Sequence, residues 1–397
     1  MEAAVKHLRA SGFKLSLPGF HIKLTEILLS QDDRSGALKW LEEINEYAVA
    51  MKSLLFEYDY ELIKAHLAFS AGYESEGLRK LQKAFTIGRE NGYGHSLWFV
   101  PNFLVDLCLK ALEHGIETDY AKALIRNHRL AHDMPPVHIE SWPWPLKVYT
   151  LGRFEILRDD KHLALSAKTQ KKPLELLKSL ISFGGENVME EQLTDSLWPD
   201  ADGDLAHRSF NTTLHRLRKL IGIDSALQLR SGRLSLIQKY CWLDTRAFEA
   251  ICAEIEDASK ADGNGKIREG NVIRHLFDKA VRLYTGHFLA SDTDLPYTSS
   301  TREHLRNRFL GIIEKAGERC CALGQWDGAI EYYSKGIETD NLAELCYQGL
   351  IICYQKLGQE TKAIEIYNRC KTAISESLGL SPSTKTEELF ASLIKKK

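Results

Sequence analysis

Membrane and secreted proteins are excluded first, because the chain has no long apolar run. No stretch approaches the roughly eighteen apolar residues of a membrane span. The first residues, MEAAVKHLRASGFK, lack the apolar core of a secretion signal. We therefore expect a cytoplasmic protein with no membrane partner. A hydrophobic content of 44% and a charged content of 27% in turn exclude a disordered or fibrous chain.

Motifs for metal binding and catalysis are missing as well. The eight cysteines have no CxxC spacing and the fourteen histidines have no paired ligand spacing, so we expect buried free thiols and no metal site. There is no nucleophile elbow, no HExxH motif and no glycine-rich fingerprint after a strand. The GNGK sequence at 263–266 lacks the spacing of a phosphate loop. We expect a protein that is not an enzyme and that carries no cofactor.

The stretch 205–222, LAHRSFNTTLHRLRKLIG, is typical of an amphipathic helix. Its apolar residues are spaced four, three and four apart, which predicts one buried stripe: Phe210, Leu214, Leu217 and Ile221. The other side presents cationic and hydrogen-bonding residues without an acid: Arg208, Asn211, Thr212, His215, Arg216 and Lys219. Such a helix can lie in the major groove of DNA. The alternative is a solvated amphipathic helix on an ordinary domain.

The residues that follow this helix favour the first interpretation. Residues 227–237, LQLRSGRLSLI, alternate as two short strands joined at Ser231-Gly232, with Arg230 and Arg233 at the tip. A helix followed by a basic hairpin is the pattern of a winged helix, whose hairpin approaches the phosphate backbone. Residues 205–240 contain seven Lys or Arg against one acid, whereas the whole chain has a formal net charge of -2.

Helical repeats are expected on both sides of this segment. In the N-terminal part, Ala37-Leu38 is echoed by Gly77-Leu78 forty residues later. In the C-terminal part, a pattern recurs with a period of 34 residues, the period of a tetratricopeptide repeat: Leu323-Gly324, Ala329-Ile330 and Tyr333 return as Leu357-Gly358, Ala363-Ile364 and Tyr367. We expect a third, weaker unit at 277–289, a flexible loop at 257–271 and a final capping helix.

The fold class predicted is therefore mostly α with a small α+β domain, in which tetratricopeptide-like helical repeats flank a central winged helix-turn-helix. Within the central domain we expect a strand pair that turns at Asp159-Asp160, followed by helices at 169–183 and 189–197. The predicted domains are 1–133 (helical repeats), 134–145 (a proline-rich linker of extended chain), 146–240 (winged helix) and 241–397 (a second set of helical repeats).

At these residues the chain resembles known families. MEEQLTDSLWP at 189–199 and RSFNTTLHRLRKLIG at 208–222, with strands before them and a hairpin after, are similar to the winged helix of the OmpR and PhoB class. Arg216-Leu217-Arg218 matches the RxLR-like run of its third helix. Over about residues 146–397 the winged helix and the repeats resemble the Streptomyces antibiotic regulatory protein (SARP) family, whose second part is called the bacterial transcriptional activation domain.

The resemblance implies a sequence-specific DNA-binding transcriptional regulator, more specifically an activator, located on the bacterial nucleoid. It implies double-stranded DNA as a partner, and RNA polymerase through the acidic loop Asp200–Asp204. It also implies copies of the chain on adjacent sites, a homo-oligomer on DNA. The groove and backbone contacts that it implies are Arg208, Asn211, Thr212, His215, Arg216, Lys219, Arg230 and Arg233.

Two departures from these families and two alternatives bear on this interpretation. Asn211 stands where the OmpR class commonly has an acid, and no phosphoacceptor receiver precedes the winged helix. The helical array begins without a polar cap, so we expect a larger protein with an upstream regulatory domain. The alternative function is a tetratricopeptide scaffold that binds proteins without specific DNA binding. A nucleotide-driven switch would require an ATPase domain upstream.

Overall fold

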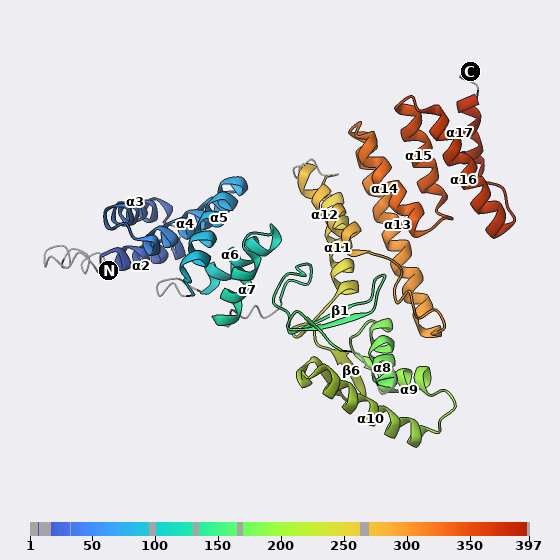
Figure 1. Ribbon diagram of the computed structural model, residues 1–397, viewed down its shortest axis with the longest axis horizontal. Helices are drawn as coiled ribbons and strands as arrows, with labels where there is room; N and C mark the ends of the chain where they lie inside the picture. Colours follow the sequence, from blue (N-terminus) through green and yellow to red (C-terminus); the bar gives the residue numbers. More distant parts are fainter. Residues whose placement is uncertain are drawn as a thin grey trace. The chain divides into compact units, whose positions relative to one another are not determined.

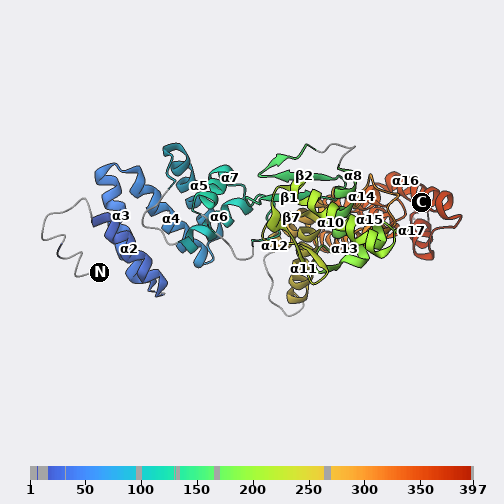
Figure 2. The same cartoon turned by 90° about the horizontal axis from the view of Figure 1, so that it is seen from below.

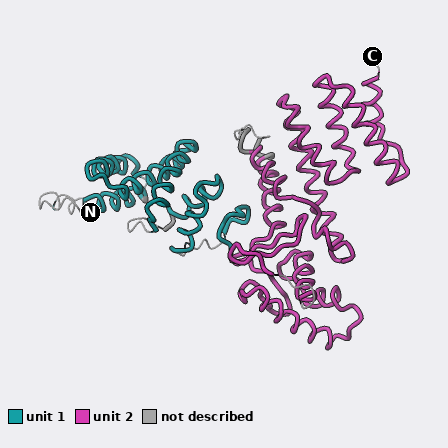
Figure 3. The backbone as a smooth tube through the Cα atoms, in the orientation of Figure 1, with its two compact units in different colours: residues 1–144 teal, residues 145–397 magenta. Residues whose placement is uncertain are grey.

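The computed structural model describes residues 7, 17–31, 33–94, 101–128, 130, 135–164, 170–262 and 270–394 (Figure 1). The chain divides into two compact units, residues 1–144 and residues 145–397 (Figure 3). Helices dominate both units, and two small sheets lie in the second. The predicted fold class, mostly α with a small α+β part, is confirmed. Among the described residues, no helix is long and apolar enough to cross a membrane.

The first unit consists of helices that pack as consecutive pairs, α2 with α3 and α4 with α5. The two small residues that the sequence matches forty residues apart occupy equivalent places, because Ala37 lies three residues after the start of α3 and Gly77 three residues after the start of α5. Both are buried, and a Cβ on Gly77 would lie 2.6 Å from the ring of Phe69. The repeated small residue therefore allows α5 to approach α4 closely. The helices of this unit are α2 Leu17–Ser30, α3 Arg34–Met51, α4 Leu54–Ser70, α5 Glu74–Asn91, α6 Pro101–Glu113 and α7 Thr118–Asn127.

The proline-rich segment after α7 is folded, not extended as the sequence predicts. Of its residues, 134 lies outside the described part of the chain. Between 135 and 144, backbone bonds close turns from Ile139 N to Pro136 O, at 2.9 Å, and from Trp142 N to Ile139 O, at 3.3 Å. The indole of Trp144 is buried and donates to Ile139 O at 2.9 Å. The buried tryptophans give this segment a reason to turn, which the prolines alone do not reveal.

The second unit begins with two sheets. Strands β1 Leu146–Tyr149, β2 Glu155–Arg158, β3 Lys161–His162 and β7 Cys241–Leu243 form one sheet in the order β3-β2-β1-β7. Strands β4 Val188–Met189, β5 Leu227–Arg230 and β6 Arg233–Leu236 form the other, in the order β4-β6-β5. The predicted turn between β2 and β3 is confirmed, since Asp159 and Asp160 have φ angles of 50° and 61°, which suit a tight hairpin.

Three helices of the second unit lie between these strands in the sequence: α8 Lys171–Ser182, α9 Glu190–Leu197 and α10 Gly203–Ile221. The order of strands, three helices and hairpin is the one predicted. The predicted start of α8, residue 169, lies outside the described residues, and α9 ends at Leu197 as expected. A 3-10 turn, Asp224–Ala226, leads from α10 into β5.

Strand β7 joins this region to the helices that follow. It pairs in parallel with β1, with Leu146 opposite Cys241 and Val148 opposite Leu243. Helix α11, Asp244–Asp262, starts at the next residue and contacts both strands. Figure 2 labels β1, β7 and α11 in this part of the unit. Because β1 and β7 share a sheet, the chain on either side of the boundary predicted at 240 belongs to one compact unit.

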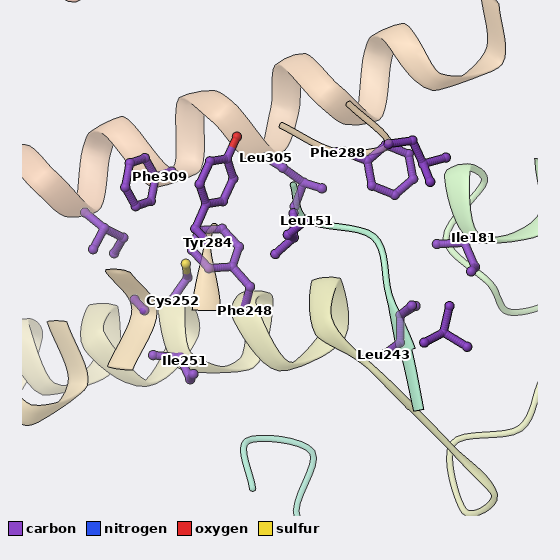
Figure 4. Close-up of a cluster of buried hydrophobic side chains, with 14 of the residues drawn as sticks. Leu151, Ile181, Leu243, Phe248, Ile251, Cys252, Tyr284, Phe288, Leu305 and Phe309 are labelled. Atoms are coloured by element: carbon purple, nitrogen blue, oxygen red, sulfur yellow. The ribbon is translucent and has the colours of Figure 1, made fainter. Parts of the chain in front are cut away.

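One hydrophobic core extends across the second unit. Its buried side chains run from Leu146 in β1 through α8, α10 and α11 to the later helices. Figure 4 shows the middle of this core, where three rings meet: Phe248 of α11, Phe309 of α13, and Tyr284, which follows α12. The rings of Tyr284 and Phe309 stack, with 4.3 Å between their centroids and 14° between their planes. Phe288 is buried in the same core. The remaining elements are α12 Gly270–Leu283, the 3-10 turn Pro296–Thr298, α13 Ser299–Ala322, α14 Trp326–Thr339, α15 Glu344–Lys356, α16 Glu360–Leu378 and α17 Thr384–Ile394.

The repeat of 34 residues is confirmed in α13 to α16, which stand side by side (Figure 1). Gly324 and Gly358 have φ angles of 71° and 69° and form the left-handed turns after α13 and α15. Ala329 and Ala363 are fully buried at the equivalent crossings. Helix α17 is the predicted final helix. Both repeats therefore turn and cross at the residues that the sequence aligns.

Two predictions about the same region hold only in part. The weaker unit expected at 277–289 is helical as far as Leu283, where α12 ends, and beyond it Phe288 forms a bridge with Leu151 of the sheet region. Thr285-Gly286 interrupts the helical pattern. The flexible loop expected at 257–271 is helical as far as Asp262, where α11 ends; its residues 263–269 lie outside the described part.

Close packing in the repeats gives a stability prediction. The ring of Tyr333 lies between Gly317 of α13 and Gly349 of α15, and a Cβ on Gly349 would stand 2.4 Å from Tyr333 Cε2. We expect Gly349→Ala to lower the free energy of unfolding by about 1–3 kcal/mol through overpacking. Gly311→Ala in α13 is the control, because its Cβ meets no atom of the described residues within 4 Å. We expect it to be neutral or to stabilise by up to about 1 kcal/mol. Thermal unfolding followed by circular dichroism compares the two; equal losses would contradict this account of Tyr333.

Candidate nucleic-acid interface

Helix α10 carries the residues that the sequence predicts as the interface. It ends at Gly222, whose φ of 73° is the left-handed conformation that glycine adopts without a steric penalty. An acid, Asp204, stands in the first turn and two bases, Arg218 and Lys219, in the last, an arrangement that the helix dipole stabilises. The acidic loop predicted at 200–204 is therefore shorter than expected, because its last two residues belong to α10.

The buried face of α10 is the predicted stripe. Phe210, Leu217 and Ile221 are fully buried and Leu214 is 2% exposed. This face packs on α8 and α9 within the core of the second unit. Full burial of such side chains is worth about 1.5–3 kcal/mol each. The stripe thus fixes which side of α10 is turned outward.

The outward face holds all six predicted helix residues. Each is exposed to solvent: Arg208, Asn211, Thr212, His215, Arg216 and Lys219. The Thr212 hydroxyl donates to Arg208 O at 2.9 Å, so it is already used as a donor within the helix. In Figure 1, α10 lies at the edge of the second unit, far from α14 to α17. The repeats of the second unit do not cover this face.

The hairpin β5–β6 stands next to α10 in the chain, and its tip carries the other two predicted residues. Arg230 and Arg233 are directly opposite each other in the register and both are exposed. Ser231 and Gly232 between them have φ angles of 48° and 68°, as in a tight two-residue hairpin turn. The predicted hairpin and its turn are confirmed, and the structure places the two arginines opposite each other at the tip, where Arg233 Nη1 also donates to Asn187 O at 3.0 Å.

Several hydrogen bonds fix the hairpin relative to the helices. Strand β4, which the sequence does not reveal because it has only two residues, pairs with β6. At the turn, Glu190 N at the start of α9 donates to Gly232 O at 2.8 Å. Arg218 of α10 donates through Nη2 to Leu227 O at 3.0 Å. Arg218 therefore links α10 to β5. Together these bonds hold the hairpin in a fixed position next to α10.

Two residues at this surface were not predicted as part of it. His207 lies one turn before Asn211 on α10, and its Nδ1 contacts the Glu190 carboxylate. The spacing of four residues between His207 and Asn211 is the only signal in the sequence that could have indicated a contact. The partner Glu190 lies seventeen residues away, and only the folded arrangement brings it there.

One family match lies within the second unit. Residues 243–394, from the end of β7 to the end of α17, match the sequence model of the family described as "Bacterial transcriptional activator domain". This match begins at residue 243, after α10 and the hairpin, so it does not cover the candidate interface. Together with the relatives below, it makes the chain similar, over part of its length, to the class of SARP-like transcriptional regulators.

Named relatives agree with this class. The Regulatory protein AfsR of Streptomyces griseus is 24% identical over 244 residues, which are 62% of this chain and 24% of AfsR. The Transcriptional regulatory protein MoaR1 of Mycobacterium tuberculosis is 24% identical over 253 residues, which are 62% of this chain and 78% of MoaR1. The match thus spans about a quarter of AfsR. A solved structure of Mycobacterium tuberculosis EmbR in complex with a low affinity phosphopeptide superposes with a TM-score of 0.49 and 20% identity, covering 64% of this chain and 66% of that one.

Proposed function

We propose that this chain regulates transcription, as an activator, by binding duplex DNA in a sequence-specific way. The observation that carries the proposal is the outward face of α10: six exposed cationic or hydrogen-bonding side chains, flanked by the two arginines of the hairpin tip. Helix α10 lies in the major groove and the hairpin lies against the adjacent backbone, as in an OmpR-type winged helix. The chain is a binding protein without enzyme activity or cofactor, and it acts in the bacterial cytoplasm on the nucleoid.

The residues divide into two groups by chemistry. Arginine and lysine contacts to phosphates supply affinity that depends on salt, and they set the register of the helix. Asn211, Thr212, His215 and Arg216 lie along the middle of the outward face and are the candidates for contacts with base edges. Arg230 and Arg233 contact the backbone, so they contribute affinity and little sequence preference.

The helical repeats serve signal response or assembly. Since the winged helix and α11 to α15 share one core, the repeats of the second unit do not rotate freely against α10. This favours assembly over reorientation within the unit. One winged helix reads only a short site, so useful specificity requires copies on adjacent sites. The loop before α10, with exposed Asp200 and Asp202, is the proposed surface for RNA polymerase.

The test is selection of duplexes from a random pool by the intact chain. The selected duplex and a shuffled duplex of equal composition are then titrated over a series of salt concentrations. We expect the selected duplex to bind about a thousandfold more tightly or better, and log affinity to fall linearly with log salt. Weak binding that is equal for both duplexes would overturn the proposal. It would favour the alternative, a tetratricopeptide scaffold for protein partners.

A further inference from the structure

Three side chains form a row at the start of α10. Nδ1 of His207 contacts the carboxylate of Glu190, which belongs to α9. On the other side of the ring, Nε2 of His207 is 3.0 Å from Nδ2 of Asn211. The same Nδ2 donates to the backbone oxygen of His207 at 3.1 Å. The row therefore leads from a carboxylate, through an imidazole, to a candidate base-reading amide.

The position of each proton follows from this geometry. A carboxylate only accepts, so Nδ1 of His207 carries the hydrogen that it donates to Glu190. In the neutral ring Nε2 is then an acceptor, and it takes one hydrogen of the Asn211 amide. The second amide hydrogen goes to the His207 backbone oxygen. Both donors of Asn211 are used, and its Oδ1 is left to meet a ligand.

The row is anchored at its far end. Glu190 is the first residue of α9, its backbone N–H donates to Gly232 O in the hairpin turn, and its side chain is 16% exposed. The carboxylate is thus fixed relative to both α10 and the hairpin. An exposed asparagine rotates freely in most settings, but here the contact through His207, itself 63% exposed, to the more covered Glu190 holds one orientation of its amide.

We propose that His207 and Glu190 are positioning residues that set the base preference of Asn211. This inference rests on the proposed DNA-binding function and deepens it. With its carbonyl oxygen outward, Asn211 accepts from a base that carries an exocyclic amine in the major groove, which is adenine or cytosine. It does not make the two-bond contact to adenine, because its amide hydrogens are occupied.

Protonation of the imidazole reverses the row. An imidazolium donates from both nitrogens, so Nε2–H requires an acceptor. Rotation of the Asn211 amide by half a turn places Oδ1 on Nε2–H and turns Nδ2 outward, where it donates to guanine or to the thymine carbonyl. His207 faces a pocket of about 560 Å³ whose charged groups come from α9 and β6: Glu190, Glu191, Asp195 and Arg233.

The experiment measures base preference, which is a ratio of affinities within one protein and is insensitive to the fraction folded. Using the intact chain and its selected duplex, Asn211→Ala first identifies the base pair whose preference disappears. At that pair, His207→Leu should reduce the preference about tenfold, a typical value for one lost base contact. His207→Gln should restore it, because the glutamine oxygen can accept from Asn211. His207→Lys, which only donates, should invert it.

The control is His304→Gln, since His304 and Glu249 form another exposed pair, at 3.0 Å, on α13 and α11. It should leave the preference unchanged. If the preference in His207→Leu and His207→Lys equals that of wild type, the positioning role is overturned while DNA binding stands. If wild type itself shows no salt-dependent, selective binding, the proposed function fails instead.

Discussion

Replacing Arg208 and Arg216 together with alanine should weaken binding to the selected duplex about a hundredfold or more. Both side chains are exposed on the outward face of α10, one before and one after its middle. Each contact of this kind is worth about 1–3 kcal/mol, and each lost phosphate contact lowers the salt slope by about 0.9. We therefore expect the slope of log affinity against log salt to fall by about 0.9 through the loss of Arg208, whereas the loss of Arg216, a candidate for base contact, lowers the affinity for the selected duplex.

The matched control removes the same charge elsewhere. Arg282 of α12 and Arg369 of α16 are exposed arginines outside the candidate interface. Their double alanine variant should bind within about twofold of wild type if affinity comes from local contacts and not from net charge. Equal losses in the two double variants, with unchanged circular dichroism, would show that α10 has no special part in binding.

Replacing Asp244 with alanine should give the largest loss of stability among single changes at the junction of winged helix and repeats. This fully buried carboxylate accepts from the hydroxyl of Thr150 at 2.7 Å, from Leu151 N at 2.7 Å and from Thr245 N at 2.8 Å, and it also contacts Thr150 N. It thereby ties the end of β1 to the start of α11. Removing it leaves buried donors without an acceptor, at a cost of about 1–3 kcal/mol for each group that water does not reach. We expect a loss of at least about 3 kcal/mol.

Urea unfolding measures this loss, and hydrogen exchange should locate it at β1 and the first turn of α11. Glu254→Ala, an exposed carboxylate of α11, is the control and should change stability by less than about 0.5 kcal/mol. Unchanged exchange at Thr150 and Leu151 in Asp244→Ala would contradict the role assigned to this side chain.

The Asp244 carboxyl also makes the stability lost in Asp244→Ala depend on pH. Burial raises the pKa of Asp244 to about 6, although its hydrogen bonds act in the opposite direction. A carboxyl whose pKa is raised by folding contributes most below its unfolded pKa of about 3.9, and that contribution is lost as pH rises through about 6. The difference in stability between wild type and Asp244→Ala should therefore be larger near pH 4 than near pH 7.

The sequence predicted the outward face of α10 and the hairpin well because their signals are local. The spacing of Phe210, Leu214, Leu217 and Ile221 determines which face of α10 is buried, and that in turn exposes the six polar residues. The hairpin is also specified by neighbours, since Ser231-Gly232 allows the left-handed conformations of the turn. The repeats were predictable for the same reason: a period of 34 residues brings Ala329 and Ala363 to equivalent crossings.

Contacts between distant residues could not be predicted in this way. Strand β7 pairs with β1, which lies more than ninety residues earlier in the chain. Strand β7 has only three residues, and so short a segment carries no pattern that would indicate a parallel partner. The row of Glu190, His207 and Asn211 depends on α9 meeting α10, which neither helix signals alone. The third unit expected at 277–289 ends early for a related reason. Phe288 is apolar, as a helical pattern would require, but its backbone forms a bridge with Leu151 and is not part of a helix.

The central claim is that the outward face of α10 lies against the duplex, and site-specific photo-crosslinking tests it most directly. A photoreactive amino acid is placed at Thr212, in the middle of the exposed face, and in a second protein at Lys371, an exposed position of α16. With the selected duplex, the account predicts a crosslink to DNA from position 212 and none from position 371. A crosslink from 371 with none from 212 would contradict it.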